Sequence, residues 1–259
     1  MSLIQQLYSH LSRPLALTNT EHDVYWDQNI LVDERGDPAI LSLVADISQW
    51  DFRMYPGINW EPQDATLLED TPGTFVIERP LHILLGPLWD TSFARLNNIL
   101  RVASPEEPSL SSTKITMEHL FFARDDGPKE MSEQEQNLDF FLTNGYSPSS
   151  FWLPRPPEHD WGQRMPNFAQ FHRIDEIYKG VRRPSLPPIS AGRDPRFLSP
   201  PSYRKNLFNS LAEIDFNVIH NGGNNFRFPL KRALVWLNPG YKRTAEHVSQ
   251  EAASGGLFL

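Results

Sequence analysis

Eleven of the 23 prolines of this chain lie between Pro148 and Pro201. Because proline has a fixed φ and no backbone N–H, a segment this rich in proline adds few hydrogen bonds to a helix or a sheet. One helix is predicted inside it, over residues 166–180, and Gly180 suits its end. The rest of residues 146–203 is predicted to form no strand ladders and to run as a long arm. Such an arm either embraces a partner or folds back on its own domain.

Outside this arm, the hydrophobic pattern predicts both strands and helices, without regular alternation of the two. Strands and hairpins are expected at 29–47, 73–78, 80–86, 113–123, 215–230 and 232–237. Helices are expected at 2–12, 90–103, 132–145, 202–211 and 243–252. Asp90 or Thr91 is expected to cap the second of these helices. The pattern predicts an α+β fold, with antiparallel hairpins, separately packed helices and the long proline-rich arm.

The two parts of the chain on either side of residue 145 carry opposite charge. Residues 1–145 hold 23 Asp and Glu against 9 Lys and Arg, a net charge of −14. Residues 146–259 hold 9 against 15, a net charge of +6. This predicts an acidic α+β region over 1–145 and a basic region over 146–259, composed of the arm (146–203) and a C-terminal hairpin. A single domain that carries the arm fits the same pattern. Such opposite charges can attract each other within one molecule or join successive copies head to tail.

Basic residues of the arm and of the helix after it are interleaved with aromatic ones. The residues expected to bind a partner are Arg182, Arg183, Arg193, Arg196, Phe197, Tyr203, Arg204 and Lys205. Guanidinium groups bind carboxylates and phosphates, and aromatic rings stack on bases. The pattern therefore fits an acidic protein face or single-stranded nucleic acid. A net charge of −8 and a pI near 5.5 favour the protein partner, because dedicated nucleic-acid binders are usually basic.

Three residues on the helix expected at 166–180 are the candidates for catalysis. His172, Asp175 and Glu176 are three or four positions apart, so they share one region of that helix surface. Such groups can share a proton or hold a divalent ion, as a metal-assisted hydrolase requires. The apolar stripe of the same helix leaves them on the solvent side, which favours ordinary surface pairs instead.

Glu118 and His119 are the other acid–base neighbours that we considered. Both lie on the strand expected at 113–123, where successive side chains point to opposite faces of a sheet. They therefore cannot act together on one group. His119 shares its face with apolar residues and is expected to lie in the core.

Other observations exclude several function classes. The chain has no cysteine, which excludes disulfides, thiolate zinc sites, iron–sulfur clusters and cysteine nucleophiles. It contains no phosphate-loop, dinucleotide-binding, serine-elbow or HExxH motif. It shows neither a secretory signal nor a run of apolar residues long enough for a membrane helix, so we expect no membrane partner and a cytoplasmic location.

These observations predict a non-enzymatic interaction protein without cofactor or metal. It would be a subunit of a larger assembly, or a specific binder or inhibitor, and its partner would be another protein or copies of itself. The alternatives are a metal-assisted hydrolase and a nucleic-acid-binding protein that uses the basic arm.

Overall fold

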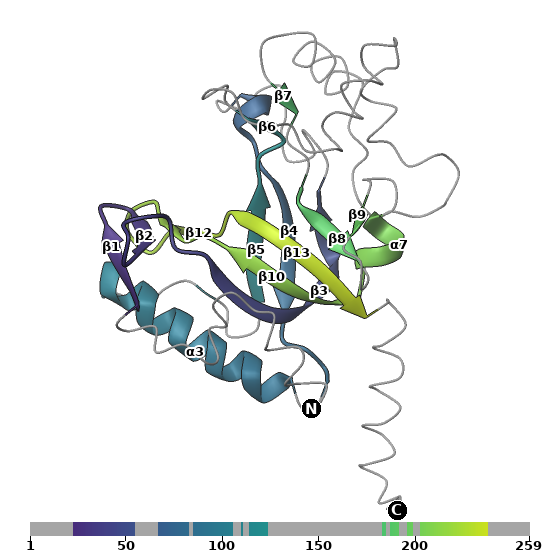
Figure 1. The fold of residues 1–259 in the computed structure, drawn as a ribbon, viewed down its shortest axis with the longest axis horizontal. Helices are drawn as coiled ribbons and strands as arrows, with labels where there is room; N and C mark the ends of the chain where they lie inside the picture. The colour runs from purple at the N-terminus through teal and green to yellow at the C-terminus, as the bar shows by residue number, and fades with distance from the viewer. Residues whose placement is uncertain are drawn as a thin grey trace, which may run out of the picture.

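A seven-stranded, curled β-sheet forms the centre of the protein (Figure 1). The computed structural model describes residues 23–54, 67–82, 85–105, 110, 114–123, 183–184, 187–191, 196–198 and 203–237. The strands of the sheet are β3 (Leu41–Arg53), β4 (Gly73–Glu78), β5 (Lys114–His119), β8 (Ile189–Ala191), β9 (Arg196–Phe197), β10 (Leu211–Phe216) and β13 (Leu230–Leu237). Their spatial order is β5-β4-β3-β10-β13-β8-β9, and only the pairing of β13 with β8 is parallel. Strands from both sides of residue 145 thus share one sheet.

The long central strand β3 makes the sheet curl, because its 13 residues serve two neighbours. Its first part, Leu41–Asp46, pairs with the whole length of β10. Its later part, from Asp46 to Arg53, pairs with β4, with a register shift between Ile47 and Phe52. Such an irregularity bends a strand and increases its twist.

The curled sheet closes partly into a barrel. The N–H of Glu118 in β5 donates to the carbonyl of Phe228 at 3.0 Å, and Glu118 forms a parallel bridge with Pro229 just before β13. Strands β5, β4, β3, β10 and β13 therefore surround one interior. Past this contact, β6 (Phe122–Ala123) pairs with β7 (Arg183–Pro184), while β8 pairs with β13. The arm thus supplies one strand next to β6, which follows β5, and another next to β13, so it contributes strands on both sides of the place where β5 meets β13.

A smaller, four-stranded sheet lies beside the barrel. It comprises β1 (Val24–Asp27), β2 (Ile30–Asp33), β11 (Ile219–His220) and β12 (Phe226–Arg227), in the order β1-β2-β11-β12. The hairpin expected at 29–47 is confirmed at its tip, where the N–H of Asp33 donates to the carbonyl of Asp37 at 2.8 Å. After this turn the chain leaves the small sheet and enters β3.

One long helix, α3 (Gly86–Ala103), packs against the main core (Figure 1). Its buried residues include Trp89, Phe93, Leu96 and Leu100, spaced three or four apart along one face, and they join the core of the barrel. Side chains of this size stabilise the fold by about 1.5–3 kcal/mol each when fully buried. The other described helices are short: the 3₁₀ turn η1 (Leu68–Asp70) and α7 (Tyr203–Leu207).

The structure contradicts the predicted α+β fold. Among the described residues, strands predominate and α3 is the only helix longer than five residues. The helices expected at 2–12, 132–145, 166–180 and 243–252 lie outside the described residues. The predicted fold class is wrong because seven of the strands assemble into one curled sheet with a smaller sheet beside it, whereas the sequence pattern predicts separate hairpins packed with several helices.

Three local predictions were also wrong. No strand occurs at the described residues 80–82 and 85–86: Gly86 already begins α3, which starts before Asp90, and its cap residue is Leu85 without a side-chain hydrogen bond. The helix expected at 202–211 ends at Leu207. The buried residues that follow, from Leu211 onward, belong to strand β10 instead. The arm was expected to form no ladders, yet it contributes β7, β8 and β9, and proline interrupts only the ends of these short strands.

Gly73 at the start of β4 lies where a side chain has no space. A Cβ atom there would lie 2.4 Å from Cε2 of the buried Phe121 and 3.0 Å from the carbonyl oxygen of Arg53. We expect Gly73→Ala to lower the free energy of unfolding by about 1–3 kcal/mol, because the backbone oxygen cannot move aside freely. Denaturant unfolding measures this. Phe121→Leu in the same chain should recover part of the loss, and strictly additive effects of the two changes would contradict the steric explanation.

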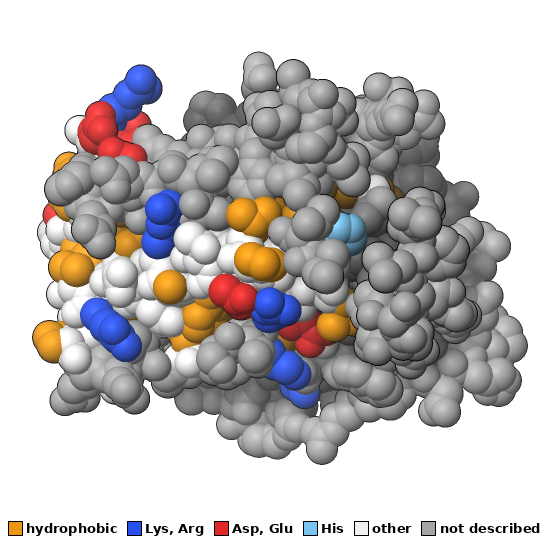
Figure 2. All heavy atoms as spheres, turned by 90° about the horizontal axis from the view of Figure 1, so that it is seen from below, with side chains coloured by type: hydrophobic (Ala, Val, Ile, Leu, Met, Phe, Trp, Pro, Cys, Tyr) orange, Lys and Arg blue, Asp and Glu red, His pale blue; other side chains and the backbone are white. Residues whose placement is uncertain are grey.

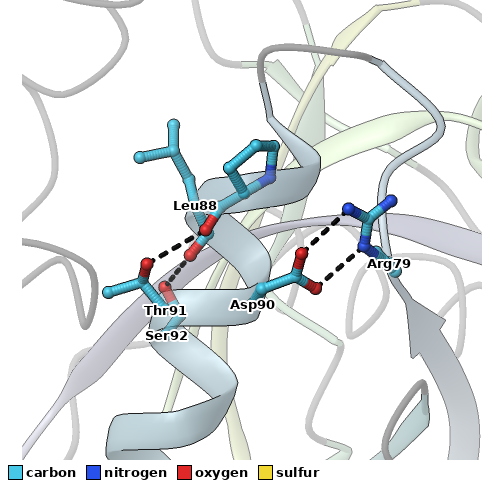
Figure 3. Close-up of polar contacts among 6 residues, drawn as sticks. Arg79, Leu88, Asp90, Thr91 and Ser92 are labelled. Atoms are coloured by element: carbon cyan, nitrogen blue, oxygen red, sulfur yellow. Dashed lines mark hydrogen bonds and ion pairs between the residues drawn. The ribbon is translucent and has the colours of Figure 1, made fainter.

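The second turn of α3 is held to the end of β4 by an exposed ion pair (Figure 3). Arg79 Nε and Nη2 donate to the two carboxylate oxygens of Asp90 at 2.8 and 2.9 Å, and this hydrogen bonding lowers the pKa of Asp90 below its usual value. Thr91 and Ser92 donate to the carbonyls of Pro87 and Leu88. Asp90 therefore pairs with Arg79 and does not cap the helix.

Gly86 allows the guanidinium of Arg79 to approach the helix. A Cβ at position 86 would lie 2.6 Å from Arg79 Nη2. The side chains of Arg79 and Asp90 are 44% and 56% exposed, so we expect Gly86→Ala to change stability by less than about 1 kcal/mol. It should abolish the coupling between Arg79 and Asp90 in a double-mutant cycle. An unchanged coupling energy in the Gly86→Ala background would show that the guanidinium keeps its position.

Candidate binding surfaces

The five barrel strands are connected as in the OB fold, a partly open Greek-key barrel. The first strand, β3, pairs with the second, β4, and the fourth, β10. The third strand, β5, meets the start of the fifth, β13, in parallel where the barrel closes. The position of α3, between the second and third strands, differs from the usual place of the OB helix. OB barrels bind ligands on the face of strands two and three and with the loops between strands one and two and between strands four and five; in this chain most of the first of these loops, between β3 and β4, lies outside the described residues.

The corresponding face of this chain is formed by β4 and β5. Its outward positions are Thr74, Val76 and Glu78 on β4 and Lys114, Thr116 and Glu118 on β5. Arg227 of β12 adds a second cation, and its Nε donates to Glu118 Oε2 at 2.6 Å. These described side chains include no aromatic ring and as many acids as bases. These described side chains therefore offer neither stacking platforms nor the positive field that single-stranded nucleic acid needs.

The loop between the fourth and fifth barrel strands is the β11–β12 hairpin, which is fixed to α3. Ser104 Oγ, at the end of α3, donates to Asn224 Oδ1 in the hairpin turn at 2.6 Å. The ring of His220 stacks on Phe226 at 4.8 Å between centroids, and Trp26 contacts both rings at 6.1 Å. The aromatic residues of this hairpin are thus engaged in packing within the protein.

A network of two buried acids, a buried serine and a partly exposed arginine crosses β3, β10 and β13. Glu213 and Asp215 of β10 are only 0% and 5% exposed, on the face of β10 opposite the apolar core residues. Arg232 of β13 donates from Nε to Asp215 Oδ2 at 2.8 Å and from Nη2 to Glu213 Oε1. Ser42 Oγ of β3 donates to Asp215 Oδ1 at 2.6 Å. Strand register brings the residues together, since Asp215 lies opposite both Ser42 and Arg232.

Glu213 is the most perturbed titratable group of the described residues. Burial raises its pKa to about 7; Arg232 opposes this rise, and Asp215 adds to it. Glu213 Oε2 is buried and has no hydrogen-bond partner in the structure. A carboxyl group with these properties is about half protonated at neutral pH, so the stability of the sheet depends on pH. Sequence reasoning missed this network. The sequence pattern that could have indicated it is the pair of acidic residues at alternate positions of the otherwise apolar strand LAEIDF, together with the arginine in the strand at 232–237.

For five of the eight residues expected to bind a partner, the structure gives the position of the backbone. Arg183 lies in β7, Arg196 and Phe197 form β9, and Arg204 and Lys205 lie in α7. Strands β8 and β9 pair with each other, and α7 follows them before β10. Arg182 and Arg193 lie outside the described residues.

Tyr203, the eighth of these residues, lies in the core. Its side chain is fully buried, and its ring packs edge-on against Phe52 with centroids 6.2 Å apart. Tyr203 therefore contributes to packing between α7 and β3. In this structure its ring is not on the surface, where a partner could stack on it.

The candidates for catalysis lie largely beyond the described residues. His172, Asp175 and Glu176 all fall outside them, so their role in a metal-assisted hydrolase stays a prediction. Within the part that the structure describes, no group of three or more His, Asp or Glu side chains has the arrangement of a metal site. Glu118 faces outward toward Arg227, while His119 is half-buried with its ring edge-on to Phe121 at 5.3 Å.

The surface seen from the side of α3 mixes charges of both signs (Figure 2). On the coloured residues of this view, acidic side chains lie next to basic ones, with hydrophobic side chains scattered among them. Among the described residues on this face, the charge separation along the sequence therefore does not appear as a patch of one sign. Among the described helices, none is long and apolar enough to span a membrane.

Comparison with protein-family models, with curated proteins and with solved structures finds no significant match. The connectivity of the barrel strands is therefore a similarity of topology, and topology alone does not assign a function.

Proposed function

We propose that this chain is a non-enzymatic binding protein that recognises an acidic protein partner through its basic arm. The observation that carries the proposal is the position of the arm at the edge of the main sheet, where β9, with Arg196 and Phe197, is the last strand. An edge strand presents backbone donors and acceptors to a second chain. The partner is another protein or a second copy of this chain, in the cytoplasm.

The charge of the arm supports an acidic partner. Between residues 182 and 205 the chain has six Lys and Arg and one Asp, Asp194. A positive segment of this kind increases the rate of encounter with a negative surface and disfavours basic partners. The acidic residues 1–145 of a second copy are one such surface.

The barrel surface favours a protein over nucleic acid. OB-type connectivity is shared with many single-strand binders, which makes nucleic acid the second candidate. However, the described outward residues of β4 and β5 have balanced charge and no ring, and Tyr203 is buried. Base stacking needs exposed aromatic rings, so the described surfaces support the protein partner better.

The proposal is tested by quantitative co-purification from the cells that make the protein. The wild-type chain is compared with Arg196→Glu and with Arg35→Glu, which makes the same charge change in an exposed turn of the small sheet. We expect an acidic protein, or untagged copies of this chain, to be retained by wild type and Arg35→Glu and depleted with Arg196→Glu. Equal recovery with all three chains would contradict the role of the arm. Retained material that nuclease removes would support the nucleic-acid candidate instead.

A further inference from the structure

We propose that β9 accepts an added β-strand from an extended acidic segment of the partner protein, a mode of binding that rests on the proposed function. The outward donor and acceptor are those of Phe197. The N–H of Leu198 donates to the carbonyl of Ile189 at 2.8 Å, so residue 198 is turned toward β8. In an antiparallel strand the N–H and C=O of one residue point the same way, and neighbouring residues alternate. The N–H and C=O of Phe197, opposite Ser190, are therefore turned away from β8, toward the side of β9 on which no described strand lies.

The edge is anchored well enough to act as a template. β8 is held to β13 by the hydrogen bond from the Ala233 N–H to the Pro188 carbonyl at 2.9 Å. Ile189 of β8 is fully buried and belongs to the main core. β9 pairs with β8 at Ser190 and Ala191. Among the described residues, no strand lies on the outer side of β9.

Proline limits how far the added strand can pair. Pro195 directly precedes β9 in the sequence, and Pro200 and Pro201 follow it closely. These residues have no N–H to donate, and proline at sheet edges prevents indefinite strand addition. We therefore infer a short ladder centred on Phe197, in which main-chain hydrogen bonds give part of the affinity. Basic residues of the arm, Arg196 among them, provide the selectivity for acidic side chains.

The experiment uses the full chain and a short, labelled synthetic peptide of alternating valine and glutamate as the probe. Phe197→Pro removes the outward N–H and tolerates the extended backbone, whereas Phe197→Ala removes the ring and keeps the N–H. We expect binding measured by fluorescence anisotropy to weaken by about tenfold in Phe197→Pro relative to Phe197→Ala. A peptide of alternating valine and lysine should bind wild type more weakly than the glutamate peptide.

Hydrogen exchange of the wild-type chain provides a measurement that does not depend on the variants folding. Adding the glutamate peptide should slow exchange of the Phe197 amide. No binding of the peptide, equal binding by the two Phe197 variants, or an unchanged Phe197 amide would overturn strand addition. If Arg196→Glu still loses its cellular partner while Phe197→Pro keeps it, the proposed function stands and only this mode of binding fails. If Arg196→Glu keeps the partner too, both fail.

Discussion

Replacing Arg232 by methionine should lower the free energy of unfolding by about 2–3 kcal/mol at neutral to alkaline pH, less than for a fully buried pair because the Arg232 side chain is 41% exposed. Arg232 is the only described cation that contacts Glu213 and Asp215, which are 0% and 5% exposed. Methionine fills a similar volume but leaves both carboxylates buried without a positive partner. Removing one member of a buried ion pair costs more than the pair contributes, because the remaining charge stays desolvated.

Two further variants separate charge from shape in this network. Arg232→Lys keeps the charge but loses the planar fork that reaches both carboxylates, so its loss should be intermediate. The triple variant Arg232→Met, Glu213→Gln, Asp215→Asn removes all three charges and should regain most of the stability of the wild type. Denaturant unfolding at constant pH measures each. A loss below about 1 kcal/mol in Arg232→Met would mean that water reaches the carboxylates and replaces the arginine.

Elements defined by local pattern were predicted well from the sequence. β4 occupies 73–78 as expected, because glycine begins it and glutamate ends an apolar stretch. The hairpin predicted around Asn221–Asn224 forms between β11 and β12, with Gly222 and Gly223 at φ +90° and +57°. Only glycine adopts such angles readily, so the turn is encoded by a few neighbouring residues.

Features that depend on residues far apart in the chain were not predicted. β8 exists because β13, more than 40 residues later, offers it a parallel neighbour, and no short-range pattern marks Ile189 as a strand residue. The same holds for closure of the barrel, where Glu118 meets Pro229. Glu213 and Asp215 look like surface residues in sequence, and only the register with Arg232 explains why they lie inside. Pairings of this kind are set by tertiary structure.

Replacing Glu213 by glutamine should make the protein more stable relative to wild type as the pH rises. The folded-state pKa of Glu213 is raised to about 7 from a usual value of 4.5. Between these values the folded chain binds more protons than the unfolded chain, so the stability of the wild type falls as pH increases. This contribution is fully present below pH 4.5 and is lost once the pH passes about 7. The difference in pKa corresponds to about 3 kcal/mol at most.

Glutamine has nearly the same shape and no titratable proton, so the variant should lack this pH dependence. We expect the two unfolding free energies to be similar below pH 4.5, where Glu213 is neutral in the folded chain and mostly neutral in the unfolded chain. Near pH 8 the unfolding free energy of the glutamine variant should exceed that of the wild type by about 1–3 kcal/mol, since the variant carries no buried charge at position 213. Glu34→Gln, in an exposed turn, shows the effect of the same chemical change at the surface. Parallel stability curves for wild type and Glu213→Gln would contradict this prediction, because they would mean that the pKa of Glu213 is the same in the folded and the unfolded chain.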